Sequence, residues 1–306
     1  MPVEVFQYTP ERRSVVEPML VALGQGQGNA AADAFFEELL VAPERRHEAV
    51  FVARDDERVV SLCLIPDRPM FGGTGRLAMP FVAPDNTDAL PQLAPLMLNA
   101  AAAYLRKIGA PRLGVMAGDA NPALQSAMLG FGLDPVMPYH RLKWTGDGTP
   151  VPVNRVEGVE YSVYRGGDAK TNEGIAKIWK SAFRADPIEP VLTPDVLEQA
   201  AERGDIWFIV ARETATGRVV GVTEAGPGSY FSGIAVARSH WGKSLADALV
   251  LTTCNEFMAQ GVNELNSMTR RNNASSSLIS GEPFDAKTMV PVKSTPYIRR
   301  PLGLMM

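Results

Sequence analysis

The hydrophobic pattern of the first half predicts strands and helices that follow one another in a definite order. Segments rich in β-branched residues or with apolar–polar alternation predict strands. These segments lie at residues 3–8, 48–54, 58–65, 76–82, 112–117 and 136–144. Apolar residues that recur every three or four positions predict helices. These lie at residues 15–23, 31–40 and 89–108, with a short one after Asn121.

The second half repeats this order of elements, although it shares little residue identity with the first half. Strands are predicted at residues 160–165, 207–212, 218–224, 231–236 and 264–270, and helices at 172–183, 194–202 and 244–260. Between the halves, residues 145–158 (TGDGTPVPVNRVEG) hold glycine, proline and polar residues without periodicity, as linkers do. We therefore expect a boundary near Pro150, with one domain at 1–150 and another at 151–306.

Length and composition agree with two globular domains and exclude several other classes. At roughly 100–200 residues per domain, a chain of 306 residues supplies two domains that could each fold alone. The formal charge of −4 and the lack of a long basic stretch argue against nucleic-acid binding. No run reaches the roughly 18 apolar residues of a membrane span, and the first residues do not resemble a secretion signal. We therefore expect a cytoplasmic protein that contacts neither membrane nor nucleic acid.

The cysteines and histidines do not form a reactive or metal-binding pattern. Cys63 and Cys254 lie far apart in apolar segments, which favours buried free thiols over a disulfide. Cys254 falls on the apolar face of the helix predicted at 244–260, so we assign it to the core. The histidines are not grouped with cysteines or carboxylates at ligand spacing, so no metal site is predicted.

The most informative segment is GIAVARSHWGKSLADAL at residues 233–249, where an apolar strand leads through a short turn directly into a helix. Unpaired N–H groups at a helix start, together with the helix dipole, favour anion binding. Small residues at Gly242, Ser244 and Ala246 would let a phosphate approach the backbone, and Lys243 adds a cation. The alternative is a plain strand-to-helix connection in which Ser244 caps the helix.

Residues 240–249 (HWGKSLADAL) resemble the signature H-R-G-K-G-L-G-x-A-L of the GNAT superfamily of acyl-CoA-dependent N-acyltransferases. Downstream, AQGVNELNSMTRRNN is similar to that family's segment in which an Asn starts the next helix, here Asn272. The repeated order of elements also fits two tandem GNAT-like domains, an architecture similar to that of mycothiol synthase, whose motifs the chain lacks. The resemblance implies an α/β (α+β) fold, in which each domain has a mixed, mostly antiparallel sheet flanked by helices.

The resemblance also implies which residues would bind acetyl-CoA or another acyl-CoA, the co-substrate of the family. The backbone of the strand before the turn, at Ile234, Ala235 and Val236, would hold the pantetheine and the thioester. The diphosphate would lie against the turn and the helix start, formed by Trp241, Gly242, Lys243, Ser244, Leu245 and Ala246.

The sequence departs from the family pattern at three places. Trp241 stands where the family usually has Arg or Gln, and Ser244 replaces the first glycine. The segment ASSSLISGEPF after Asn273 has no Tyr at the position where the family commonly places a general acid. In the first half, the corresponding junction carries Asp85 and Asp88 and no glycine, and these carboxylates would repel a diphosphate. We therefore expect the first domain to be degenerate and the second to bind acyl-CoA.

These patterns lead to the expectation of an acyltransferase, most simply an N-acetyltransferase, acting on a small-molecule amine or amino acid. Glu224, at the end of the strand predicted at 218–224, is the candidate general base, and a solvated strand-end carboxylate is the alternative. The acceptor pocket is expected at residues 24–47 and 184–205. Two other functions stay open, a catalytically inert GNAT-like protein that binds CoA or a metabolite, and a GNAT-fold enzyme with a hydroxyl acceptor or another acyl donor. A homodimer also stays open.

Overall fold

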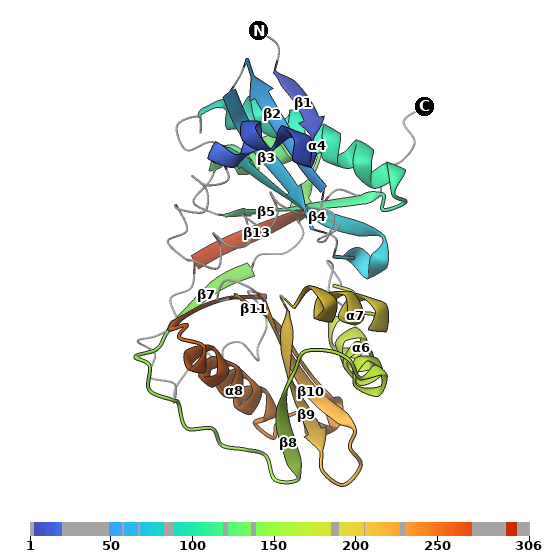
Figure 1. Cartoon of the computed structure of the whole chain (residues 1–306), viewed down its shortest axis with the longest axis vertical. Helices are drawn as coiled ribbons and strands as arrows, with labels where there is room; N and C mark the ends of the chain where they lie inside the picture. Colours follow the sequence, from blue (N-terminus) through green and yellow to red (C-terminus); the bar gives the residue numbers. More distant parts are fainter. Residues whose placement is uncertain are drawn as a thin grey trace. The chain divides into compact units, whose positions relative to one another are not determined.

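The computed structural model places two compact units in the chain (Figure 1). One consists of Met1–Pro138 with Lys293–Met306, and the other is Tyr139–Val292. The structure describes residues 3–19, 49–56, 58–66, 68–82, 88–118, 122–135, 139–184, 190–204, 206–226, 230–270 and 292–298.

The first unit has a mixed sheet in the order β1-β2-β3-β4-β5-β13, with β6 paired to β13. Its strands are β1 (Glu4–Gln7), β2 (Ala49–Asp55), β3 (Arg58–Ile65), β4 (Gly75–Val82), β5 (Arg112–Gly118), β6 (Asp134–Pro135) and β13 (Val292–Ile298). Its helices are α4 (Leu90–Lys107) and α5 (Pro122–Gly130), residues 13–19 are also helical, and short 3-10 turns lie at Pro10–Arg12 and Phe71–Gly73. Of these strand pairs, β4 and β5 are parallel and the others antiparallel. The buried face of α4 packs on this sheet.

The second unit has a sheet in the order β7-β12-β11-β10-β9-β8. Its strands are β7 (Tyr139–Thr145), β8 (Val159–Tyr164), β9 (Trp207–Glu213), β10 (Val219–Gly226), β11 (Tyr230–Val236) and β12 (Glu264–Arg270). Its helices are α6 (Ala169–Phe183), α7 (Pro194–Arg203) and α8 (Leu245–Ala259), with a 3-10 turn at Arg238–His240. Among these strands, only β11 and β12 pair in parallel.

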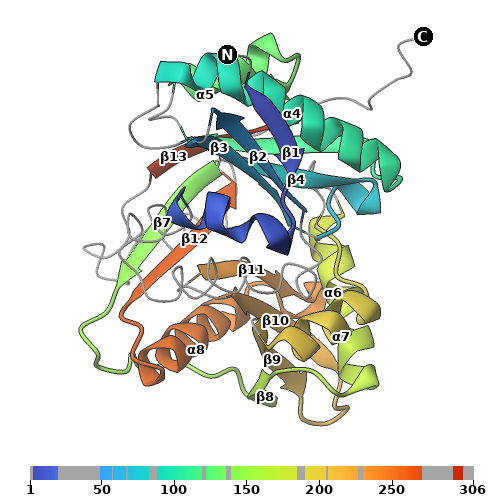
Figure 2. The same cartoon turned by 45° about the horizontal axis from the view of Figure 1, so that its top comes forward.

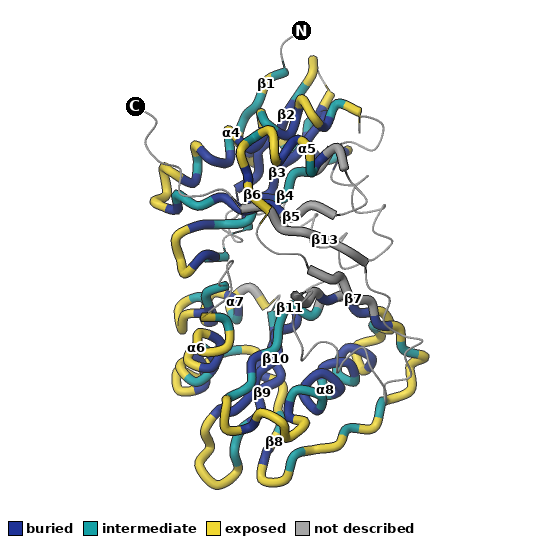
Figure 3. The backbone as a smooth tube through the Cα atoms, turned by 180° about the vertical axis from the view of Figure 1, so that it is seen from behind, coloured by how far each residue is buried: buried dark blue, intermediate teal, exposed yellow. Residues whose placement is uncertain are grey.

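The helices of the second unit cover both faces of its sheet (Figure 2). Ile175, Trp179 and Leu197 of α6 and α7 pack with Phe208 and Val210 on one face. On the other face, α8 packs on the alternate strand residues, such as Ile209 and Ala211. Because side chains along a strand alternate between faces, one strand segment such as 207–211 contributes side chains to both hydrophobic cores. Since both faces of the sheet are covered, β9, β10 and α8 are largely buried, as Figure 3 shows.

Within the described residues, the predicted strands and helices occur in the expected order, and the fold class of mixed, mostly antiparallel sheets flanked by helices is confirmed. The helix predicted at 31–40 lies outside the described residues. Cys63 and Cys254 are buried and free, as expected. Burial raises the pKa of each thiol to about 12, so both are neutral over the physiological range. Among the helices of the described ranges, none combines the length and the apolar character that crossing a bilayer requires.

The main difference from the sequence analysis concerns the last strand of each half. We expected the strand at 136–144 to complete the first domain, but β7 pairs antiparallel with β12 of the second unit, from Tyr139↔Arg270 to Thr145↔Glu264. Conversely β13, which the sequence analysis did not predict, pairs with β5 of the first unit. The contacts therefore divide the chain at Pro138 and Lys293 rather than near Pro150. An alternating pattern shows that a segment is a strand but does not show which strand it pairs with.

The segment expected to be a linker is irregular but belongs to the second unit. Residues 146–158 form no helix or strand. Val151 donates its backbone N–H to Asn255 Oδ1 of α8 at 2.8 Å and accepts from Asn255 Nδ2 at 2.8 Å. Val151 and Val156 also pack on the core beneath α8.

Candidate functional site

The candidate site begins where two neighbouring strands of the second unit diverge. The parallel strands β11 and β12 pair only at Tyr230↔Asn266 and Phe231↔Ser267, although β11 continues to Val236. A bulge causes the change of direction, because Phe231 lies opposite Ala225 and Gly233 lies opposite Glu224, which leaves Ser232 as an extra residue. Beyond the bulge, one edge of β11 has no partner strand among the described residues.

Strand alternation decides which backbone groups of β11 point to that open edge. Ala237 donates its N–H to the Val220 carbonyl of β10 at 2.8 Å. Backbone groups alternate along an antiparallel strand, so those of Ala235 also face β10, while those of Ile234 and Val236 point to the open edge. Of the three strand residues predicted to hold pantetheine, Ile234 and Val236 direct their backbone groups to the open edge. Ala235 instead packs its side chain in the core.

The turn after β11 leaves a series of backbone N–H groups without acceptors. Gly242 has φ +71° and Ser244 has φ +56°, so both are left-handed, and α8 starts at Leu245. Ala248 donates to the Ser244 carbonyl at 3.1 Å. Within the part of the chain that the structure describes, the amides of residues 242–247 donate to no protein group. A Cβ built on Gly242 would meet nothing within 4 Å, so the turn is open.

Ser244 occupies the N-cap position of α8, but its side chain makes no cap hydrogen bond. Capping by the serine side chain is therefore absent, while a plain strand-to-helix connection stays the alternative to an anion site. Instead Ser244 adopts the left-handed conformation that a glycine adopts readily. The free amides and the dipole of a helix of 15 residues together suit an anion.

Trp241 is the largest exposed side chain at this turn, with 62% of its surface accessible. Its indole Nε1–H donates to the Val236 carbonyl at 3.0 Å, so the indole is held against the end of β11. The guanidinium carbon of Arg238 lies 5.6 Å from the Trp241 ring centroid, within cation–π range. The sequence analysis did not predict a role for Arg238. Its position three residues before Trp241 was the sequence feature that could have indicated one.

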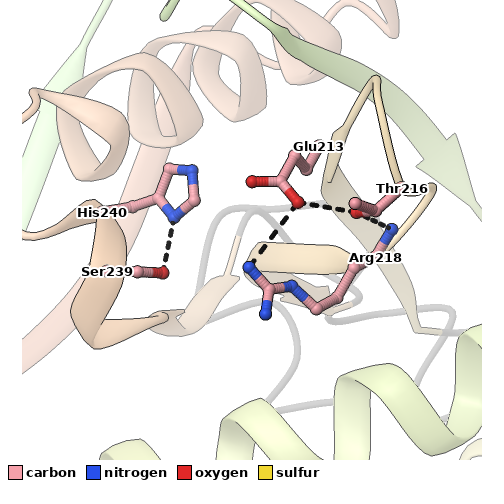
Figure 4. A network of polar contacts seen from close by, with 5 residues as sticks. All are labelled: Glu213, Thr216, Arg218, Ser239 and His240. Carbon is pink, nitrogen blue, oxygen red and sulfur yellow. Dashed lines mark hydrogen bonds and ion pairs between the residues drawn. The ribbon is translucent and has the colours of Figure 1, made fainter.

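Near the turn, Lys243 and Arg238 carry positive charge, while Asp247 in the first turn of α8 and the nearby Glu213 carry negative charge. Figure 4 shows Glu213 with its partners Thr216 and Arg218. Thr216 Oγ1 donates to Glu213 Oε2 at 2.6 Å, and Arg218 lies 3.6 Å from the same oxygen. These two, then His240 and Lys243, lower the pKa of Glu213. His240 is buried, and its Nδ1 lies 3.0 Å from Ser239 Oγ.

Glu224, the predicted base, is buried rather than solvated. It is 1% exposed and lies opposite Gly233 in the pairing of β10 with β11. Its neighbour Thr223 contacts Thr253 of α8 at 2.7 Å, so by alternation Glu224 lies on the α6 face. On that face a Cβ at Gly233 would lie 2.7 Å from Trp179, so only glycine fits beside the carboxylate. The expectation of a solvated strand-end carboxylate is therefore wrong.

An apolar pocket lies beside the diverging strands, between them and α8. Its lining residues are Trp144, Phe231, Val250, Thr253, Cys254, Leu265 and Ser267. Trp144 comes from β7, the strand that the sequence analysis had assigned to the first domain, so this strand contributes to the pocket.

Several predicted residues cannot be placed. Asn272, the segment at 274–284 that lacks a Tyr, the acceptor region expected at 24–47 and the first-half junction at 83–87 lie outside the described residues. Of the acceptor region expected at 184–205, the structure describes helix α7 and its flanks.

Comparisons with known proteins support the fold. No protein-family model matches the sequence. No curated protein matches it either. Solved structures do match. A tandem GNAT protein from the clavulanic acid biosynthesis pathway superimposes with a TM-score of 0.68 at 15% identity, over 97% of this chain and 98% of that chain. A GCN5-related N-acetyltransferase from Sphaerobacter thermophilus gives a TM-score of 0.63 at 15% identity, over 97% and 95% of the two chains.

At these identities the similarity concerns the fold. Both matches span nearly the whole of each chain, so they cover both units together. The resemblance read from residues 240–249 is thus confirmed at the level of architecture. The chain has the tandem-domain fold of the GCN5-related N-acetyltransferases.

Proposed function

We propose that the second unit is an acyl-CoA-dependent N-acyltransferase domain, with acetyl-CoA as donor and a small-molecule amine or amino acid as acceptor. The observation that carries the proposal is the open turn at residues 242–247, whose amides donate to no described protein group directly beside the unpaired edge of β11. Such a turn followed by a helix suits a diphosphate, and a free strand edge suits an extended chain of amides. Pantetheine is such a chain.

Each part of the site has a role in this proposal. The amides of Gly242, Lys243, Ser244, Leu245 and Ala246 bind the diphosphate, and the Lys243 ammonium adds attraction. The backbone of Ile234 and the N–H of Val236 pair with pantetheine, because Trp241 already occupies the Val236 carbonyl. Asn272 stays an expectation from the family pattern.

The reaction is the attack of the acceptor nitrogen on the thioester carbonyl, which forms the C–N bond and breaks the C–S bond. The acceptor nitrogen loses a proton, and the departing thiolate gains one from water. Glu224 takes the acceptor proton. Since Glu224 is 1% exposed, it acts through an intervening water molecule rather than by touching the amine. General-base catalysis of this kind contributes roughly a hundred- to ten-thousandfold.

The first unit is not assigned a donor site. Its junction sequence carries Asp85 and Asp88, and α4 begins after Ala89 with no side-chain cap and a proline in its first turn. A proline removes one of the N–H groups that would otherwise face an anion. We therefore assign acyl-CoA binding to the second unit alone.

The burial of Glu224 also favours a second candidate, a protein that binds acyl-CoA without turnover. A buried base opposite Gly233 is a weaker catalyst if no water reaches it. The two candidates share the donor site and differ in product formation.

Calorimetry with acetyl-CoA tests the shared donor site. We expect Lys243→Glu to weaken binding at least tenfold, because it places a negative charge at the turn. Lys180→Glu on the exposed side of α6 makes the same charge change away from the turn and should leave binding unchanged. Equal effects of the two variants, or no binding by the wild type, would contradict the assignment. Release of free thiol with a panel of small amines then separates the acyltransferase from the inert binder.

A further inference from the structure

We propose that Trp241 is a stacking platform for the adenine ring of the acyl-CoA, an inference that rests on the proposed donor site. Trp241 stands where the family pattern has Arg or Gln, which donate hydrogen bonds but offer no indole surface. The inference concerns what this residue adds to binding of the nucleotide end.

The exposure of Trp241 is unusual among the tryptophans of the chain. Trp144, Trp179 and Trp207 are 6%, 1% and 4% exposed, whereas Trp241 is 62% exposed. A large aromatic ring left in water loses the free energy that burial would provide, so a ligand that covers it gains that free energy.

The ring is also held in a fixed orientation before any ligand binds. The indole N–H is engaged by the Val236 carbonyl at 3.0 Å, and Arg238 lies 5.6 Å from the ring centroid. A pre-oriented ring loses little conformational freedom on stacking, which favours affinity.

The position of Trp241 selects the occupant. It directly precedes Gly242, so its Cα lies about 3.8 Å from the first residue of the open turn. In acyl-CoA, a single ribose separates the adenine from the diphosphate. A diphosphate on the turn amides therefore brings adenine within reach of this ring, and Arg238 and Lys243 give the surroundings the positive charge that a phosphorylated nucleotide needs.

The choice of ligand fragments tests the inference directly. Adenosine 3′,5′-bisphosphate carries adenine without pantetheine, and 4′-phosphopantetheine carries pantetheine without adenine. With the full-length protein, we expect CoA and adenosine 3′,5′-bisphosphate to quench the fluorescence of the exposed tryptophan, and 4′-phosphopantetheine to quench it less than either.

The ligand affinities of Trp241 variants measure how much the ring contributes to binding. Trp241→Ala should weaken CoA binding about tenfold or more, the usual range for loss of one base stack, and should weaken 4′-phosphopantetheine binding much less. Trp241→Gln, which restores a family-typical residue, should behave like Trp241→Ala, whereas Trp241→Phe should retain most of the affinity. Leu129→Ala, another exposed apolar side chain, should change nothing.

The outcomes separate this inference from the donor site itself. If the wild type binds CoA and Trp241→Ala binds it equally well, the platform is refuted while the donor site stands. If Trp241→Ala instead alters only the oligomeric state in sedimentation, the ring contacts a second copy of the chain and the inference is wrong. If neither CoA nor its fragments bind the wild type, both the donor site and the platform are refuted.

Discussion

At the scale of single residues, the turn before α8 contains two residues in the left-handed conformation, one a glycine and the other a serine. Gly242 at φ +71° adopts this conformation without steric cost, whereas Ser244 at φ +56° does so with a Cβ. The family pattern has glycine at the second position. Ser244 therefore keeps the turn geometry at a cost in stability.

This difference gives a paired prediction. Ser244→Gly should raise the free energy of unfolding by about 1 kcal/mol, and Gly242→Ala should lower it by about 1 kcal/mol, because only the left-handed backbone changes in each case. Gly242→Ala is a suitable comparison for Ser244→Gly, because the added Cβ would meet nothing within 4 Å and so adds no steric clash. Urea denaturation midpoints measure both. A destabilised Ser244→Gly protein would show that the serine side chain has a structural contact.

Glu224 gives the second residue-scale prediction. If its carboxylate accepts the acceptor proton, Glu224→Gln should reduce turnover at least a hundredfold while acetyl-CoA affinity is retained. The matched control is Glu202→Gln, an exposed carboxylate on α7. Steady-state rates and calorimetry provide the two readouts. Near-normal turnover of Glu224→Gln would remove Glu224 from the mechanism and favour a purely structural role for the buried carboxylate.

At the scale of elements, α6 depends on a charged N-cap and α7 on a neutral one. Asp168 accepts from the amides of Lys170 and Thr171 at the start of α6. It also accepts from the Thr171 hydroxyl, and this bond is the main reason that its pKa is lowered. Thr193 Oγ1 accepts from the Val196 amide at 3.2 Å at the start of α7.

The two caps should respond differently to pH. Folding lowers the pKa of Asp168, so the folded state binds fewer protons than the unfolded state, and the cap's contribution is lost as pH falls through the folded pKa. The destabilisation by Asp168→Ala should therefore be present at pH 7 and shrink toward pH 3. Thr193→Ala should cost about 1 kcal/mol at both pH values. Urea unfolding at several pH values measures this, and a pH-independent effect of Asp168→Ala would contradict the assigned cause.

At the scale of the whole molecule, two strands lie in the unit that the sequence order does not suggest. Strand β7 pairs with β12 of the second unit, and β13 pairs with β5 of the first unit. Because β7 belongs to the sheet of the second unit, a cut near Pro150 separates that sheet from its edge strand. It also removes Trp144 from the core under α8. A cut at Tyr139 and Val292 keeps the second unit continuous.

Two fragments test this division. The fragment of residues 139–292 should unfold in a single cooperative transition, since it retains β7 and Trp144. The fragment 151–306 should unfold with a lower midpoint or without a cooperative transition, because β12 loses its partner and an apolar surface is exposed. Circular dichroism during urea titration compares them. Equal cooperativity of the two fragments would show that β7 adds little to the second unit.

The sequence by itself determined the order of most of the described elements, the buried cysteines and the strand–turn–helix junction at residues 233–249. Each of these follows from a local period or a local motif, which the sequence carries directly. Only the tertiary structure decided which strands pair, because the same alternating pattern suits any partner. It also decided that the first amides of α8 have no described acceptor, that β11 leaves β12 after Phe231 and that Glu224 is buried opposite Gly233. These properties depend on contacts between residues far apart in the chain, so no local pattern contains them.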